Sequence, residues 1–279
     1  MASAVDLIGG AAQELKRSLE HAQRAAEAGN RAAQSELAAL VGNWRLVADL
    51  AAGKKQRDDT WGRLREAVNV ERWLGVPHPA LLSESPRIGT AKAYLSPQIC
   101  DWLIRLGKPH LDAAQIQDPQ SGELRYVTGR TNQAAVLSPE RGDLVLAFVR
   151  ARIAALADLP VQALEPTQVL HYEVGQEFAA HHDYLDVSFP GYAADVEKHG
   201  QRVMTVLVYL NDDFEGGHTA FPLLDLRYKG RKGDAIAFWN LADDGTPQPR
   251  TLHIGTAPTS GEKWLLSQWI RIRVAPKAR

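Results

Sequence analysis

The spacing of apolar residues divides the chain into a helical part and a part with short strands. From residue 11 to 74, apolar side chains recur every three or four positions among Ala, Glu, Arg and Gln residues, which favour helices. We predict three helices there, the first ending near Gly29, the second continuing through Trp44 and the third following Asp59. The run 22–42 is typical of a Sel1-type or tetratricopeptide-like helical hairpin, or of an ordinary helical layer.

The proline distribution marks a boundary after these helices. None of the 15 prolines occurs before Pro77, and three of them lie in the segment 75–86. Because proline removes a backbone donor and clashes with the preceding turn, an unbroken helical pattern is expected only before this point. We therefore predict an N-terminal helical segment, residues 1–76, and a second domain, residues 85–279.

The second domain begins with helices and continues as strands. Ser96 is placed to cap a helix that begins with Pro97 and reaches Gly107, and another helix is expected over about 139–158. After these, four segments are rich in Val, Ile, Thr and aromatic residues: TQVLHYEV, RVMTVLVYL, AIAFWNL and KWLLSQWIRIRV. Strands that follow one another without intervening helices predict an antiparallel sandwich or barrel.

Composition and charge exclude several classes of function. The net charge of −1 gives no basic footprint for nucleic acid, and the 45% hydrophobic content is typical of a chain with a packed core. No apolar run reaches the length of a membrane span and the first residues do not resemble a signal peptide, so we expect no membrane partner and a cytoplasmic location. The single cysteine, Cys100, excludes an intramolecular disulfide and is expected to be a buried packing residue.

The residues with the clearest chemical potential are two histidines and an aspartate. His181 and Asp183 are two positions apart after a predicted strand, so they point to the same side, whereas His182 points away. With His253, they would supply the two imidazoles and one carboxylate of a non-haem Fe(II) site. An H-x-D tripeptide alone is a weak signal, because it also occurs often by chance.

Further residues could complete an anion pocket beside such a metal. If the chain turns at 258–261, Lys263 would project into the same cavity as His253 from a strand of the same sheet. Its ammonium group could hold a carboxylate, with Thr219 and Tyr172 as hydroxyl donors, although most lysines are simply solvated.

Five parts of the second domain form an ordered set of motifs: QVLHYEVGQEFAAHHDY, GQRVMTVLVYLND with EGGHTAFP, KGDAIAFWNL, LHIGTAP and GEKWLLSQW. Through these motifs, residues 85 to 275 resemble the prolyl 4-hydroxylase group of Fe(II)/2-oxoglutarate-dependent dioxygenases, in its soluble bacterial and algal form. The lead-in LSPQICDWLI and the later RTN are also similar to the family's segment before the barrel. The first 75 residues lie outside the resemblance.

The resemblance implies a fold and a set of roles. The fold would be α+β, a double-stranded β-helix or jelly-roll core with supporting helices. The iron ligands would be His181, Asp183 and His253. Lys263 would hold the distal carboxylate of 2-oxoglutarate, Tyr172 and Thr219 would line the same pocket, and Arg202 and Trp269 would flank the substrate mouth. The cofactors implied are Fe(II), 2-oxoglutarate, O2 and ascorbate as reductant, with succinate and CO2 as products.

Two positions depart from the family pattern and bear on the substrate. Phe178 stands where the family often has a tyrosine, and Arg271 stands where peptidyl enzymes commonly have histidine. Arg271 with Arg202 could hold a carboxylate, which gives the hypothesis of a free amino acid or another small acid as substrate. The segment 186–199 is expected to be a long loop, either a lid over the iron or a plain surface loop.

The substrate therefore stays open between a small molecule and a prolyl residue of a peptide. Two alternatives are a protein hydroxylase that recruits a partner through its N-terminal helices, and a non-catalytic 2-oxoglutarate-binding sensor.

Overall fold

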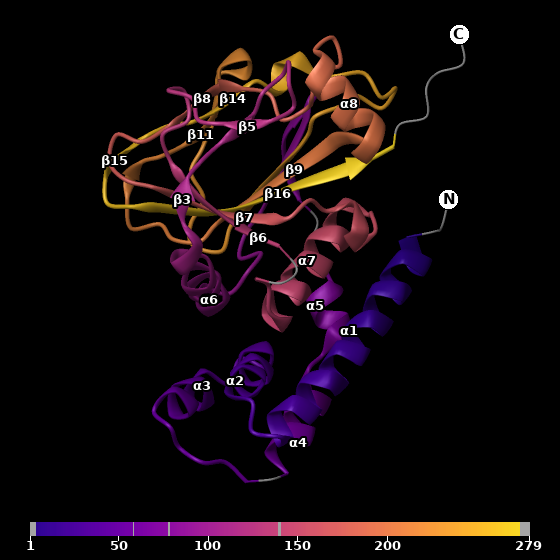
Figure 1. Cartoon of the computed structure of the whole chain (residues 1–279), viewed down its shortest axis with the longest axis vertical. Helices are drawn as coiled ribbons and strands as arrows, with labels where there is room; N and C mark the ends of the chain where they lie inside the picture. Colours follow the sequence, from indigo (N-terminus) through magenta and orange to yellow (C-terminus); the bar gives the residue numbers. More distant parts are fainter. Residues whose placement is uncertain (1–3, 58, 78, 139–140, 274–279) are drawn as a thin grey trace. The chain divides into compact units, whose positions relative to one another are not determined.

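The structure is a computed structural model that describes residues 4–57, 59–77, 79–138 and 141–273 (Figure 1). Its internal contacts define two compact units, which are described separately. The first comprises Met1–Val76 and Pro139–Gln162, and the second comprises Pro77–Ser138 and Ala163–Arg279. The first unit thus joins the N-terminal helices to a segment that lies beyond the proline boundary in the sequence.

The first unit is built from helices, and its predicted helices are broken more often than the periodicity suggested. Their bounds are α1 (Ala4–Glu27), α2 (Arg31–Leu40), α3 (Trp44–Ala51), α4 (Thr60–Ala67), α5 (Val70–Leu74) and α7 (Leu144–Ala157). The prediction of one helix continuing through Trp44 is wrong, because Gly42 has φ +75° and the Asn43 side chain caps a new helix. Asn69 likewise starts α5 by accepting a hydrogen bond from the backbone N–H of Arg72 at 2.7 Å.

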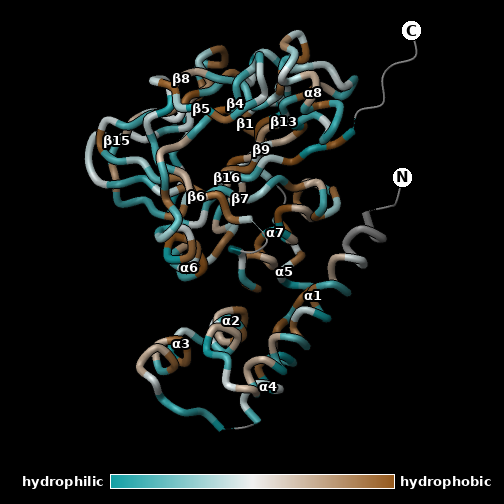
Figure 2. The backbone as a smooth tube through the Cα atoms, in the orientation of Figure 1, coloured by the Kyte–Doolittle hydropathy of each residue, from teal (hydrophilic) through white to brown (hydrophobic). Residues whose placement is uncertain are grey.

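The helices of this unit bury one another's apolar faces. Apolar and polar positions follow one another along α1, as expected of a helix with one buried side (Figure 2). Phe148 of α7 is fully buried and meets the ring of Trp73 edge to face at 5.5 Å. The Arg152 guanidinium then caps the end of α5 by donating to the carbonyl oxygens of Trp73 and Gly75. None of the described helices of the chain is long and apolar enough to cross a membrane.

The second unit is built from antiparallel strands. Its eight-stranded sheet has the order β1-β2-β13-β9-β16-β7-β6-β3, and a four-stranded sheet has the order β12-β11-β14-β8. In the large sheet the strands are β1 (Ala80–Glu84), β2 (Arg87–Ala91), β3 (Asp112–Ala113), β6 (Gln133–Leu137), β7 (Thr167–Tyr172), β9 (Gln201–Tyr209), β13 (Ala235–Trp239) and β16 (Lys263–Ile272). The small sheet contains β8 (Phe178–His181), β11 (Thr219–Phe221), β12 (Leu226–Tyr228) and β14 (His253–Gly255). Two short pairs are β4 (Ile116–Gln117) with β5 (Leu124–Arg125), and β10 (Glu215–Gly216) with β15 (Pro258–Ser260). The predicted α+β class is confirmed, and all four predicted strand segments form strands.

Buried side chains of both sheets form the core of this unit. Residues two apart on a strand share a face, which places Leu207 and Tyr209 of β9 in the same cluster as Leu170 and Tyr172 of β7. From the small sheet, Phe221 joins that cluster, with Ile88, Phe214, Ile236, Phe238 and Leu265 among its other members.

Helices complete the second unit. Helix α6 (Pro97–Gly107) begins as predicted, with the Ser96 hydroxyl accepting from the N–H of Ile99, and it buries Cys100 completely. Burial raises the pKa of the Cys100 thiol to about 12, as expected of a packing residue. The prediction of a loop over 186–199 is wrong for its second part, where Pro190 starts helix α8 (Pro190–His199). Single 3-10 turns are η1 (Lys108–His110), η2 (Val161–Ala163), η3 (Pro222–Leu224) and η4 (Pro249–Thr251).

The packing of α6 on β7 leads to a stability prediction. A Cβ at Gly107 would lie 2.7 Å from Cβ of Val169, an atom tethered to the strand backbone. Gly107→Ala should therefore destabilise the protein by about 1–3 kcal/mol, despite the helix propensity of alanine. Urea unfolding measures this, and the same substitution should cost less in a Val169→Gly background, which removes the Cβ atom that the new side chain would meet. Equal costs in both backgrounds would contradict the proposed clash.

Candidate metal centre and adjoining pocket

The small sheet brings the three predicted metal ligands together. His181 ends β8 and His253 begins β14, and the antiparallel pairing of these strands sets the two residues opposite each other. Asp183 follows two positions after His181, with its Oδ1 3.6 Å from His181 Nε2 and its Oδ2 3.6 Å from His253 Nε2. One ligand atom from each residue lies within 4.8 Å of the others, so one cation could contact all three.

The hydrogen bonds of the histidines leave the required nitrogen atoms free for a metal. His181 Nδ1 lies 2.8 Å from the carbonyl oxygen of Ala179, and His253 Nδ1 lies 3.0 Å from that of Thr251. Since a carbonyl oxygen only accepts, each Nδ1 carries the hydrogen and each Nε2 keeps its lone pair. Burial, together with the charge of His253, lowers the pKa of His181 to about 3, which keeps its imidazole neutral.

Asp183 supplies the negative charge of the centre. Burial alone would raise the pKa of this carboxyl group. Electrostatic interaction with the neighbouring His253 and His181 and a hydrogen bond from Thr205 outweigh that effect and lower the pKa. Two neutral imidazoles and one carboxylate are the donor set expected for Fe(II), so the residues present fit the metal.

A pocket continues from the metal ligands to Lys263. Its lining includes the ligands together with Tyr172, Thr219 and Lys263, as well as Arg130, Leu170, Phe178, Leu207, Gly255, Leu265, Ser267 and Trp269. His253 and Lys263 lie on strands of different sheets, so the prediction that they share a sheet is wrong. The chain does turn as expected between them, at β15 and at Gly261, whose φ is +72°.

Lys263 is a buried cation of this pocket. Its side chain is fully buried and, among the described residues, its Nζ has no hydrogen-bond partner. The nearest aromatic group is the ring of Tyr172, whose centroid is 4.9 Å from Nζ. Burial lowers the pKa of Lys263 to about 7. A buried ammonium without a partner is costly, and an anion that enters the pocket would remove that cost.

Tyr209 restricts what Thr219 can donate, and the sequence analysis missed it. The Tyr209 hydroxyl donates to the carbonyl oxygen of Tyr228 at 2.9 Å, which uses its only hydrogen. At its second contact, 3.0 Å from Thr219 Oγ1, Tyr209 therefore accepts and Thr219 donates. The Thr219 hydroxyl would have to turn its hydrogen away from Tyr209 to donate to a carboxylate. The alternation of β9, where Tyr209 follows two positions after the pocket residue Leu207, was the available signal.

Phe178 and Arg130 form a stack behind His181. The Phe178 ring lies against the His181 imidazole with 3.5 Å between centroids and 17° between planes. The Arg130 guanidinium lies 4.5 Å from the Phe178 centroid and donates to the carbonyl oxygen of Gln115 at 2.8 Å. Arg130 belongs to the RTN segment and was not predicted as a site residue, although an arginine beside the barrel motifs was a usable signal.

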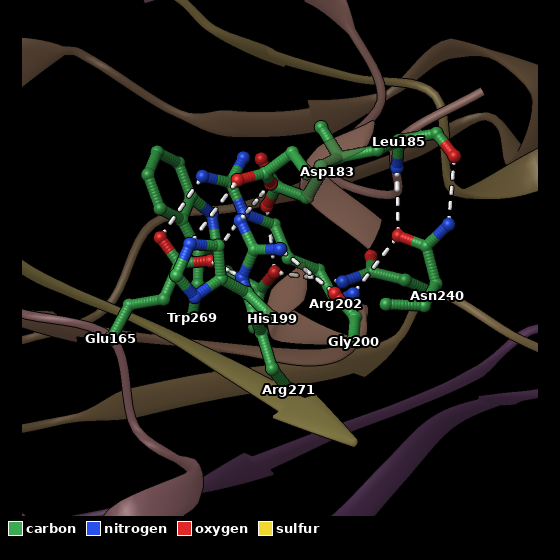
Figure 3. A network of polar contacts seen from close by, with 12 residues as sticks. Glu165, Asp183, Leu185, His199, Gly200, Arg202, Asn240, Trp269 and Arg271 are labelled. Atoms are coloured by element: carbon green, nitrogen blue, oxygen red, sulfur yellow. Dashed lines mark hydrogen bonds and ion pairs between the residues drawn. The ribbon is translucent and has the colours of Figure 1, made fainter. Parts of the chain in front are cut away.

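The two arginines predicted at the mouth are paired with acids. Glu165 accepts from Arg202 Nε at 2.6 Å and from Arg271 Nε at 2.5 Å (Figure 3). Arg271 also reaches Asp195 of α8 at 2.7 Å, and the Arg202 guanidinium stacks 3.6 Å from the Trp269 ring centroid. Trp269 and Phe178 line the pocket, whereas Arg202 and Arg271 are not among its lining residues.

Three other histidines have partners of their own. His182 Nε2 donates to the carbonyl oxygen of Pro249 at 2.9 Å. His171 lies between Gln133 and Glu262, each 3.1 Å away, and His199 pairs with Asp195 at 4.0 Å. Within the described part of the chain, no further group of histidines, cysteines and acids is arranged to hold a metal.

Comparison with known proteins agrees with this geometry. Residues 167–271 match the model of the 2OG-Fe(II) oxygenase superfamily. Prolyl 4-hydroxylase 1 of Arabidopsis thaliana is 35% identical over 227 residues, covering 73% of this chain and 78% of that protein. Prolyl 4-hydroxylase 5 of the same plant is 32% identical, covering 74% of each. The viral collagen prolyl hydroxylase of Paramecium Bursaria Chlorella virus-1, solved as a 2OG complex, has a TM-score of 0.50 and 27% identity, covering 67% of this chain and 96% of that one.

The chain therefore belongs to the 2OG-Fe(II) oxygenase superfamily, as a prolyl 4-hydroxylase-like enzyme with a jelly-roll core. The family implies Fe(II), 2-oxoglutarate and O2. The described residues fit both groups: the His181, Asp183 and His253 cluster fits the metal, and the unpartnered Lys263 fits a carboxylate in the same pocket.

The lowered pKa of Lys263 predicts a pH dependence of 2-oxoglutarate binding. Only the protonated amine attracts a carboxylate, and in the empty pocket the proton leaves at a pKa of about 7. The affinity of Mn(II)-saturated protein should therefore fall as the pH rises above this value, by up to about tenfold per pH unit. Calorimetric titration with 2-oxoglutarate across neutral pH measures it.

Lys263→Arg is the matched control. A guanidinium keeps its charge throughout this range, so any residual affinity of the variant should not depend on pH. A wild-type affinity that stays constant above neutral pH would contradict the assignment of Lys263.

Proposed function

We propose that the protein hydroxylates a prolyl residue within a peptide or protein, consuming 2-oxoglutarate and O2 and releasing succinate and CO2. The observation that carries the proposal is the single pocket with the His181, Asp183 and His253 centre and the unpartnered Lys263 ammonium. These groups match the two ends of 2-oxoglutarate, a chelating 2-oxo acid at one end and a carboxylate at the other. Bound Fe(II) would supply the activation of O2, coupled to the oxidation of 2-oxoglutarate.

The residues of the chain have separate tasks in this proposal. Lys263 binds the distal carboxylate and so fixes which end of 2-oxoglutarate faces the metal. Tyr172 is almost fully buried, and burial raises the pKa of its hydroxyl to about 12, so it stays a neutral donor. The rings of Phe178 and Trp269 offer apolar contact to a pyrrolidine ring and exclude water from the metal.

The charge pairing at Glu165 favours a peptidyl substrate over a free amino acid. The hypothesis of a small acid needed Arg202 and Arg271 to be available for its carboxylate. Each guanidinium already binds Glu165, and Arg271 also binds Asp195, so a substrate carboxylate would have to displace buried ion pairs. A residue inside a peptide carries no charge at its backbone ends and avoids that cost. Relatives named prolyl 4-hydroxylase support the same substrate class.

The reductant, the cellular location and a protein partner stay predictions. Ascorbate would serve to restore Fe(II), and the cytoplasm is the proposed location. Recruitment of a protein partner by residues 1–76 is also retained as a prediction, but α1, α2 and α5 pack with α7 in one unit, which supports a structural role for them.

Mass spectrometry of defined substrates tests the proposal. A proline-rich peptide incubated with protein, Fe(II), 2-oxoglutarate and ascorbate should gain the mass of one oxygen atom per modified proline. The same peptide with alanine in place of proline should not. His181→Ala should abolish product, and Lys263→Met should raise the KM for 2-oxoglutarate much more than the KM for peptide. Turnover of a free amino acid, without turnover of any proline peptide, would overturn the proposed substrate class.

A further inference from the structure

The metal-ligating carboxylate is attached to a buried chain of hydrogen bonds that the proposed function does not use. Asp183 Oδ2 accepts from the hydroxyl of Thr205 at 2.6 Å, and Thr205 Oγ1 accepts from the side-chain amide of Asn240 at 3.0 Å. The three side chains are 3%, 1% and 0% exposed, so water does not compete for these bonds. Figure 3 shows Asp183 and Asn240 in the same polar network.

The donor and the acceptor of each hydrogen bond in this series follow from the chemistry of the side chains. An ionised carboxylate only accepts, so the Thr205 hydroxyl must spend its single hydrogen on Asp183. That leaves the Thr205 oxygen as an acceptor, and the NH2 group of Asn240 is the donor that faces it. The reverse amide orientation would set two acceptors against one hydroxyl hydrogen. The Asn240 amide therefore fixes the direction in which the Thr205 hydroxyl donates.

Asn240 is itself held rigidly at the end of β13. Its backbone N–H donates to the carbonyl oxygen of Val203 at 2.8 Å, and its carbonyl oxygen accepts from the N–H of Gln248 at 2.9 Å. Thr205 sits within β9, whose neighbours β13 and β16 flank it on both sides. These hydrogen bonds thus connect the rigid central sheet to Asp183, which lies in the segment after β8.

The two oxygens of Asp183 consequently differ. Oδ2 is bound to Thr205, whereas Oδ1 has no hydrogen-bond donor among the described residues. A carboxylate with one oxygen held by a strong donor binds a metal best through its other oxygen. A carboxylate that bound through both oxygens would occupy an additional coordination position.

We propose that Thr205 and Asn240 are positioning residues that make Asp183 a one-oxygen ligand, and thereby keep open the metal positions that 2-oxoglutarate and O2 need. The inference rests on the proposed function, since it concerns the same metal centre. It assigns a role to two residues that do not line the pocket and do not touch substrate.

Mn(II) binding by the full-length protein, measured from the electron paramagnetic resonance of the free ion, tests the inference without any turnover. Thr205→Val keeps the shape of the side chain and removes the hydroxyl, and should weaken Mn(II) binding about 10–100-fold. Thr205→Ser keeps the hydroxyl and should retain wild-type affinity.

Thr167→Val is the matched control. Thr167 is a fully buried threonine of β7 in the same sheet, and its hydroxyl also donates a 2.6 Å hydrogen bond, to Gln268 Oε1. The same substitution there removes an equivalent bond away from the metal and should leave Mn(II) affinity unchanged.

The affinity for 2-oxoglutarate is a second measurement, and it distinguishes a change in how Asp183 binds the metal from a general loosening of the fold. In Mn(II)-saturated Thr205→Val, Asp183 is free to bind through both oxygens and to compete with the chelating end of 2-oxoglutarate. The affinity for 2-oxoglutarate should then fall by about tenfold, whereas it should be unchanged in Thr167→Val. If Thr205→Val does not fold, as judged by circular dichroism, Asn240→Leu is tested in its place, with a several-fold loss of both affinities expected.

The outcomes separate this inference from the proposed function. Wild-type protein that binds Mn(II) and 2-oxoglutarate, with Thr205→Val binding both equally well, would overturn the inference and leave the function intact. Wild-type protein that binds no Mn(II) would overturn both.

Discussion

The antiparallel pairing of β8 with β14 is the contact on which the site depends. It places His181 opposite His253, although these residues lie far apart in the sequence. Because side chains alternate along a strand, a shift of one residue in this register would turn His253 away from Asp183. The β14 strand is also paired with β11, which carries Thr219, so one small sheet orders the metal ligands and one wall of the pocket together.

The large sheet contributes the buried amine and the buried tyrosine hydroxyls beside the metal ligands. Lys263, Tyr172 and Tyr209 come from β16, β7 and β9, which lie side by side in its centre (Figure 1). Holding an ammonium group there without a partner lowers its pKa and stores a cost that an anionic ligand relieves. The large sheet thus maintains a buried amine that is unfavourable without a partner, and in the proposed function 2-oxoglutarate would supply that partner.

The sequence was sufficient for local features and for motifs, and it failed where distant strands meet. The Ser96 cap, the four strand segments and the shared side of His181 and Asp183 could be predicted because each is encoded by a few neighbouring residues. Lys263 was singled out through the family resemblance, since its spacing from His253 alone was not sufficient. The breaks at Asn43 and Asn69 were missed because apolar periodicity continues through them, while the side-chain caps that end it are local polar contacts. Thr205, Asn240 and Glu165 were missed for another reason. In sequence they are ordinary strand or loop residues, and only the register of β9, β13 and β16 brings them to the site.

The distribution of paired and unpaired charge supports the proposal that an anionic cosubstrate and a neutral substrate occupy different parts of the pocket. Outside the lining of the pocket, the cations Arg202 and Arg271 are compensated by Glu165 and Asp195. At the closed end, Lys263 has no compensating acid within the described structure. In the proposed function, the anionic cosubstrate would pair with Lys263, and the rings of Phe178 and Trp269 would remain for a neutral substrate. This separation requires that the metal keep positions open between the two ends, which is the property that the Thr205 hydrogen bond to Asp183 would secure.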